Sequence, residues 1–253
     1  MNVLKMRSMW LHTGMILIVS SCASVPKPNS SDFAVHQTLV LAQKSDGIDG
    51  SLEILRDQRL TELDIKALQE HDPDTSPENS TRFKNNPLKP ARLLLKSNDG
   101  QVLQSLHLEK PYATLEIAET GANKHAILVT QDFGIGMGSY NGPITKILDV
   151  TSDSMTWAKA RQRHDGGAIP ISLMRSLKSA WNFISTSEGK DILAVNSRPD
   201  EGSLEKFTTV FSRYHHDKSG WIVLTRSEGL LWEAEDGDHR LGYALPDQKK
   251  FPR

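Results

Sequence analysis

From residue 91 onward, short apolar runs alternate with polar residues and are separated by Gly, Asn and Asp. Leu93, Leu94 and Leu95 occupy the centre of one run, and Leu106 and Leu108 fall on one face of the next. A period of two predicts β-strands, because successive side chains of a strand point to opposite faces. The pattern predicts strands at 92–97, 101–108, 112–117, 125–130, 144–150, 155–158, 169–173, 180–184, 192–196, 207–214, 221–226 and 230–234.

Turn residues separate these runs. Asn98-Asp99-Gly100 is typical of a tight turn, and Pro170 favours an edge strand because proline has no N–H to donate. The predicted fold is mainly β, an antiparallel β-sandwich or barrel-like meander with one short N-terminal helix. A propeller-like β fold is the alternative, although no repeat of about 40–50 residues marks individual blades.

The helix is expected at 62–71. Thr61-Glu62-Leu63-Asp64 resembles a capping box, and Pro73 would end the helix. The apolar pairs Leu63/Ala67 and Ile65/Leu68 have helical spacing. Residues 51–56 are compatible with either a strand or a helix.

Proline and polar residues suggest the domain boundaries. Residues 72–90 hold four prolines with Asn and Ser between them and predict a linker. This linker would separate a small N-terminal segment, 37–71, from a β domain at 91–243. The polar residues 244–253 would form a loose tail.

The first 22 residues have the order of a secretory signal. Lys5 and Arg7 precede an apolar stretch over residues 9–19, which is followed by the small residues Ser20 and Ser21 and then by Cys22. The apolar stretch is too short for a membrane-spanning helix, which needs about 20 apolar residues. No later segment approaches that length, so no transmembrane helix is predicted.

Val19-Ser20-Ser21-Cys22 resembles the lipobox of bacterial lipoproteins. The resemblance implies that residues 1–21 are a signal peptide and that acyl chains are attached to Cys22. His12, inside the apolar stretch, departs from the usual pattern. In such lipoproteins an Asp directly after the cysteine resembles an inner-membrane retention signal. Here that residue is Ala23, so the resemblance implies an outer-membrane anchor with the body of the protein facing the periplasm. Residues 22–36 would be the acylated cysteine and a Pro- and Ser-rich tether.

Composition and net charge limit the classes of molecule that this chain is expected to bind. The 253 residues are 38% apolar and 24% charged, which is ordinary for a globular chain with a sizeable core. The formal net charge of −1 gives no overall field to attract nucleic acid, so no nucleic-acid partner is expected. The single cysteine excludes an intramolecular disulfide.

A glycine-rich stretch at 132–143 is the most unusual motif. It matches neither phosphate-binding pattern, and no amphipathic helix follows it. The first interpretation is a tightly turned loop between the strands at 125–130 and 144–150. The alternative is a binding surface formed by Asp132, Ser139, Tyr140 and Asn141 on this loop.

No catalytic residue, metal or cofactor is predicted. Ser139 has no G-x-S-x-G context. His215-His216-Asp217 lies in an expected hairpin turn, where neighbouring side chains point in opposite directions. The tryptophans of the expected body are predicted to pack against sheet faces rather than to form an aromatic platform; they are Trp157, Trp181, Trp221 and Trp232.

Three functional hypotheses follow. The first is an envelope lipoprotein that binds a protein, peptidoglycan or glycan partner, including an inhibitor or immunity role. The second is a tethered hydrolase whose site combines distant residues such as Asp132, His164 and Asp165. A polar pocket holding a hydrogen-bonded His–carboxylate pair would favour it. The third is a structural component of an envelope assembly, which exposed apolar patches or unpaired edge strands would favour.

Overall fold

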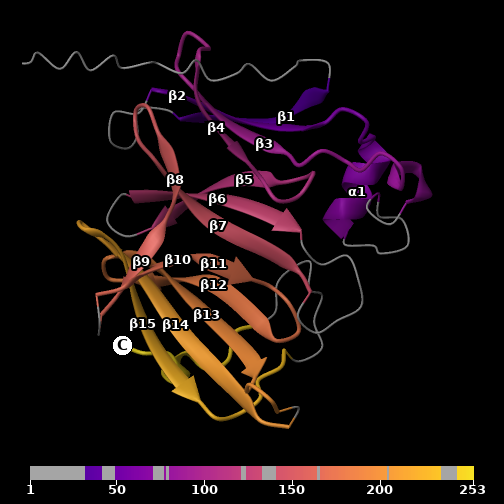
Figure 1. Ribbon diagram of the computed structural model, residues 1–253. Coiled ribbons are helices and arrows are strands. Elements are labelled where there is room, and N and C mark those ends of the chain that lie inside the picture. Colours follow the sequence, from indigo (N-terminus) through magenta and orange to yellow (C-terminus); the bar gives the residue numbers. More distant parts are fainter. Residues whose placement is uncertain are drawn as a thin grey trace, which may run out of the picture.

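A computed structural model describes residues 32–41, 49–70, 77, 80–120, 124–132, 141–163, 166–203, 205–234 and 244–253. Within these residues the chain forms three β-sheets that stack face to face (Figure 1). We name them the N-terminal, middle and C-terminal sheets. Every pairing is antiparallel except that of β15 with β9, which is parallel.

The N-terminal sheet has the order β1-β2-β3-β4, formed by β1 (Phe33–Leu41), β2 (Gly50–Asp57), β3 (Arg92–Lys96) and β4 (Val102–His107). The middle sheet has the order β11-β7-β6-β5, formed by β5 (Thr114–Thr120), β6 (Lys124–Asp132), β7 (Pro143–Val150) and β11 (Ser172–Met174), with β8 (Met155–Trp157) beside β7. The C-terminal sheet has the order β10-β9-β15-β14-β13-β12, formed by β9 (Lys159–Gln162), β10 (Ala168–Pro170), β12 (Ser179–Thr186), β13 (Gly189–Pro199), β14 (Phe207–Asp217) and β15 (Gly220–Glu228).

The middle sheet is buried on both faces. In β6, Ile127 and Val129 pack in the core shared with the N-terminal sheet. Ala126 and Leu128 of the same strand pack in the core shared with the C-terminal sheet. An uninterrupted apolar run suits this position, because both faces of the strand are covered.

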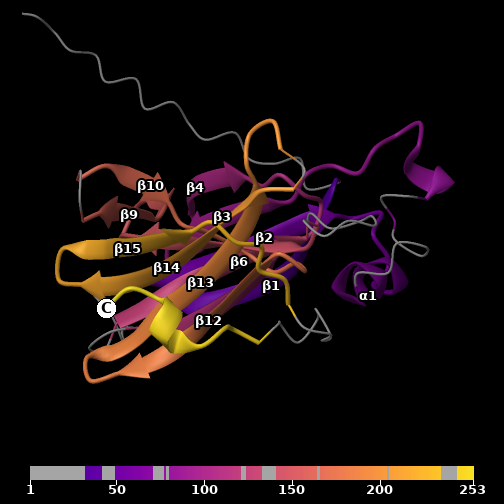
Figure 2. The same cartoon turned by 90° about the horizontal axis from the view of Figure 1, so that it is seen from below.

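The outer face of the C-terminal sheet is partly covered by the last part of the chain (Figure 2). Phe251 packs edge-on against Phe211 of β14, with ring centroids 5.5 Å apart, and is 4% exposed. Trp232 also packs there. The residues expected to be a loose tail at 244–253 therefore contribute a buried aromatic ring to the core.

The strand predicted at 230–234 is wrong. These residues form no ladder with any strand that the structure describes. Their backbone instead makes single hydrogen bonds, from Trp232 N to Ser197 Oγ at 3.3 Å and from Ala234 N to Leu177 O at 2.8 Å. Apolar side chains do alternate in this segment. Trp232 and Ala234 pack onto the outer face of the C-terminal sheet, but the backbone that carries them is irregular.

Helix α1 (Glu62–Glu70) confirms the helix predicted next to the capping box. Thr61 N donates to Asp64 Oδ2 at 2.7 Å, and Asp64 N donates to Thr61 Oγ1 at 3.3 Å. This reciprocal pair is the capping-box geometry with Asp in place of Glu. Ile65 and Leu68 pack with Tyr112, and Ala67 is buried, as the predicted apolar face requires. Leu63, which the spacing paired with Ala67, is instead 80% exposed.

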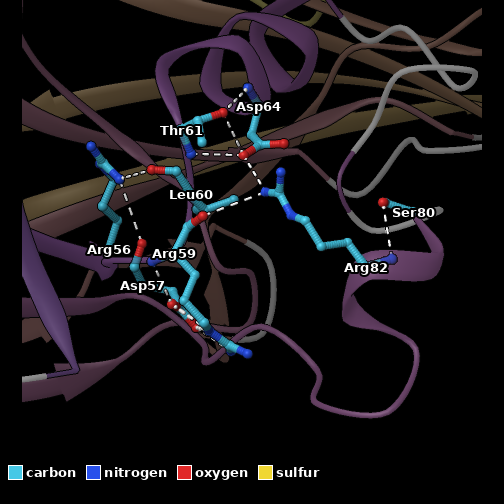
Figure 3. Close-up of polar contacts among 8 residues, drawn as sticks. All are labelled: Arg56, Asp57, Arg59, Leu60, Thr61, Asp64, Ser80 and Arg82. Carbon is cyan, nitrogen blue, oxygen red and sulfur yellow. Dashed lines mark hydrogen bonds and ion pairs between the residues drawn. The ribbon is translucent and has the colours of Figure 1, made fainter.

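The segment between β2 and β3 is held by a polar network (Figure 3). Asp57, whose side chain is 1% exposed, pairs with Arg59 at 2.6 Å. Arg82 pairs with Asp64 at the start of α1. Both guanidinium groups also lie over the ring of Phe83. These groups satisfy one another, so we assign the network a structural role.

The fold prediction is confirmed at the level of class: the protein is mainly β, with antiparallel sheets and one helix among the described residues. None of the sheets closes into a barrel within the described ranges, and the sheets are stacked layers rather than blades. Residues 51–56, left open by the sequence, lie in strand β2. Pro170 lies in β10 at the edge of the C-terminal sheet, as predicted. Within the part of the chain that the structure describes, no helix is long and apolar enough to cross a membrane.

Candidate ligand-binding site

The predicted binding loop lies mostly outside the described residues. Asp132 is the last residue of β6, where its backbone pairs with Pro143 of β7, and nothing is described of its side chain. Asn141 is exposed, whereas Ser139 and Tyr140 are outside the described ranges. The loop connects two paired strands, as the first interpretation required.

The end of this loop meets the backbone before β12. A Cβ atom added to Gly142 would lie 1.7 Å from the carbonyl oxygen of Arg175. Arg175 N in turn donates to Pro143 O at 3.1 Å. Gly142 is therefore required by close backbone approach, which a side chain would prevent.

The other predicted residues are not placed. Cys22, His164 and Asp165 lie outside the described residues. The hydrolase site proposed from Asp132, His164 and Asp165 therefore has no described geometry.

His215 and His216 lie on opposite faces of the C-terminal sheet, as adjacent residues of a strand must. His216 stacks on Trp221, a residue of the core facing the middle sheet, with ring centroids 4.6 Å apart. His215 instead contacts Asp191. The two rings cannot face one ion, which confirms the sequence argument. They lie in strand β14 itself, and not in a turn.

Asp191 brings together two side chains of β14. Its carboxylate, 1% exposed, accepts a hydrogen bond from Arg213 Nε at 2.6 Å. Its other oxygen lies 2.8 Å from His215 Nδ1. An ionised carboxylate can only accept, so Nδ1 carries the proton in this pair. The second ring nitrogen of His215, Nε2, faces Glu188 Oε2 at 3.5 Å.

These residues line a cavity of about 440 Å³ on the outer face of the C-terminal sheet. The cavity lies where the β12–β13 and β14–β15 hairpins turn, and Arg253 is among the residues that line it. Figure 2 shows the C-terminal end of the chain near these two hairpin turns. Strand β15 supplies an apolar floor, because Ile222 pairs with His215 and Leu224 with Arg213. The remaining lining residues are Arg163, Thr186, Ser187, Glu188 and Arg253. The volume is within the range of about 300–1,000 Å³ that is typical of ligand sites.

The cavity has parts of a catalytic site, but among the described residues no hydroxyl nucleophile is hydrogen-bonded to its histidine. A buried carboxylate that orients a histidine is the arrangement that activates serine in hydrolases. Here Nε2 of His215 faces a carboxylate, and no described hydroxyl lies within hydrogen-bonding distance of it. Thr186 Oγ1, which lines the cavity, donates to Gly189 O at 3.2 Å. The arrangement is better suited to holding a ligand than to attacking one.

No group of three or more metal-ligating side chains occurs among the described residues. Among the side chains that line this cavity, three are arginines and two are acidic, which disfavours a cation.

The four tryptophans pack as predicted. Trp181 and Trp221 lie in the core between the middle and C-terminal sheets. Trp157 packs against the core on the other side of the middle sheet, and Trp232 packs on the outer face of the C-terminal sheet. Their separation among three cores provides no shared aromatic platform.

Sequence reasoning missed Asp191 and Arg213. Arg213 and His215 are two positions apart, which places both side chains on one face of a strand. The sequence alone could therefore have grouped these two residues. Asp191 could be added only by knowing how β13 pairs with β14.

Comparison with known proteins adds no relative: no protein family, curated protein or solved structure matches this chain.

Proposed function

We propose that this protein is a lipid-anchored lipoprotein of the bacterial envelope, facing the periplasm from the outer membrane, whose β body binds a partner. The observation that carries the proposal is Val19-Ser20-Ser21-Cys22 after a charged and an apolar segment. Acyl chains on Cys22 would supply the anchor, since more than one chain is needed for stable membrane attachment.

The position of the cavity supports a binding role. Residues 23–32 separate Cys22 from β1, and fully extended they would span roughly 35 Å. Strand β1 belongs to the N-terminal sheet, whereas the cavity is on the outer face of the C-terminal sheet. The middle sheet lies between them (Figure 1). A tether attached at β1 would leave the cavity open to partners in the envelope.

The anchor is tested by cell fractionation of Cys22→Ser. We expect the wild-type chain in the membrane fraction, with an acylated N-terminal peptide by mass spectrometry, and the variant in soluble or uncleaved form. Ser24→Ala, which changes a residue outside the lipobox, is the control and should fractionate like wild type. Unchanged fractionation of Cys22→Ser would reject the lipid anchor.

The binding role is tested by crosslinking in cells, followed by purification and mass spectrometry. One stoichiometric envelope partner or a cell-wall fragment is expected. Crosslinks scattered over unrelated proteins would argue against a dedicated binding function.

A membrane-tethered hydrolase is the second candidate, favoured by the Asp191–His215 hydrogen bond. It predicts that the full chain hydrolyses simple esters or cell-wall fragments and that His215→Gln abolishes the activity. If the wild-type protein hydrolyses neither substrate, this candidate is rejected.

An assembly component is the third candidate, and one observation favours it. Strand β1 is an edge of the N-terminal sheet, and its Val35 and Val40 are 57% and 68% exposed. An edge with exposed apolar residues can pair with another chain. Crosslinks concentrated on β1 would favour this candidate over a ligand-binding cavity.

A further inference from the structure

We propose that the cavity lined by Arg163, Arg213 and His215 binds the anionic group, a carboxylate or phosphate, of a small organic ligand. The inference rests on the proposed binding function and names its ligand class.

The first support is the guanidinium group of Arg213, which Asp191 holds in place before any ligand binds. Asp191 is buried and holds Arg213 through Nε at 2.6 Å. The Nη1 and Nη2 groups of Arg213 donate no hydrogen bond to any described residue. A guanidinium held by one edge offers its other N–H groups to a ligand, and two such parallel bonds match the oxygens of a carboxylate or phosphate. Because the side chain is already ordered, binding loses less conformational entropy.

The second support is a positive charge without an internal partner. Arg163 follows β9, is exposed, and forms no ion pair with a described residue. The acids of the lining are Asp191, already paired with Arg213, and Glu188, whose side chain is 73% exposed. Among the lining side chains, positive charge is in excess.

The third support is the shape and floor of the cavity. Ile222 and Leu224 form an apolar surface beside the charged groups. A bare inorganic ion would leave this surface unused, whereas an organic anion would cover it. Ligand sites commonly combine an apolar wall with a few oriented polar groups.

The test is calorimetric titration of the full chain in detergent with phenyl phosphate and, separately, with benzoate, each of which carries an apolar ring beside its anionic group. We expect saturable binding of at least one anion at low ionic strength, with the two titrations showing whether phosphate or carboxylate is preferred. Arg163→Gln should weaken binding on the order of tenfold, the effect of losing one charge-assisted hydrogen bond. Arg163 is exposed, so this variant should fold.

Arg226→Gln is the matched control. Arg226 lies on β15, pairs with Glu228 at 2.7 Å, and does not line the cavity. The variant removes the same charge and should bind like wild type. Absence of saturable binding by either anion, or an equal loss in both variants, would overturn the inference.

The two proposals can fail separately. A chain that fractionates with the membrane and crosslinks to one partner, but binds neither anion, would overturn only the anion site. A chain that binds the anions but shows no lipid anchor would overturn the lipoprotein proposal and leave the site intact.

Discussion

The carboxylate of Asp57 accepts a hydrogen bond from the backbone N–H of Lys89 at 2.9 Å, although 32 positions separate the two residues. Arg59, held by Asp57, donates to the carbonyl oxygens of Asn86 and Pro87 at 2.9 and 2.8 Å. The end of the stretch expected to be a linker, 72–90, is therefore fastened to the end of β2. The buried carboxylate of Asp57 therefore ties together the two ends of the segment between β2 and β3, which contains α1.

Asp57→Ala should destabilise the protein by about 3 kcal/mol, because it removes one partner of a buried ion pair and leaves polar groups unsatisfied. Urea unfolding would measure the change. Asp49→Ala, at an exposed position just before β2, is the control and should stay within about 0.5 kcal/mol of wild type. Equal stability of the two variants would show that the Asp57 network is dispensable.

Stability should fall as the pH drops below about 4. Burial alone would raise the pKa of Asp57, but hydrogen bonds from Arg59 and Lys89 outweigh it and hold the pKa below its ordinary value. The pKa of Asp64 is likewise lowered, since hydrogen bonds from Thr61 and Arg82 outweigh burial. A lowered carboxyl pKa contributes stability that is present above the unfolded-state pKa and is lost as the pH falls through the folded-state pKa.

The measurement is the free energy of unfolding between neutral and acidic pH. Asp57→Asn and Asp64→Asn should each flatten its fall in the acidic range, because the group that takes up the proton is gone. An unchanged slope in both variants would assign the acid sensitivity to other carboxylates.

Gly142→Ala should destabilise the protein by about 2 kcal/mol, because a Cβ there would overlap the carbonyl oxygen of Arg175 and force the backbone to shift. Gly229→Ala is a matched control, since no atom lies within 4 Å of a Cβ at that position. Thermal unfolding distinguishes the two. If both variants melt together, the contact between Gly142 and Arg175 relaxes without cost.

Phe251→Ala should cost about 3 kcal/mol, the usual loss for deleting a buried aromatic ring. The ring of Phe251 packs on Phe211, which is fully buried. Lys249→Ala, an exposed change in the same short segment, should have little effect. A small effect of Phe251→Ala in urea unfolding would mean that the C-terminal segment is not part of the core.

The fold class could be predicted because its signals are local. Alternation in β4 and β5, the capping box before α1 and the edge proline Pro170 each depend on a few neighbouring residues. The segment 230–234 shows the limit of this reasoning. Its apolar residues alternate like those of a strand, but whether a chain joins a ladder depends on where it meets the sheet.

The candidate site could not be predicted for a related reason. Asp191 follows one turn, and Arg213 and His215 lie more than twenty positions later. Only the register between β13 and β14 places Ile192 opposite Tyr214 and so brings Asp191 beside His215. A slip of one residue would turn the carboxylate to the other face of the sheet. Local patterns contain no information about that register.

The burial of β6 on both faces has a consequence for how the molecule unfolds. Removing the C-terminal sheet would open Ala126 and Leu128 to water, and removing the N-terminal sheet would open Ile127 and Val129. Neither outer layer can detach without a large hydrophobic cost, so the three layers should melt as one cooperative unit. A chain interrupted after β8, as during synthesis, would present a bare apolar sheet and be prone to self-association until the last seven strands are added.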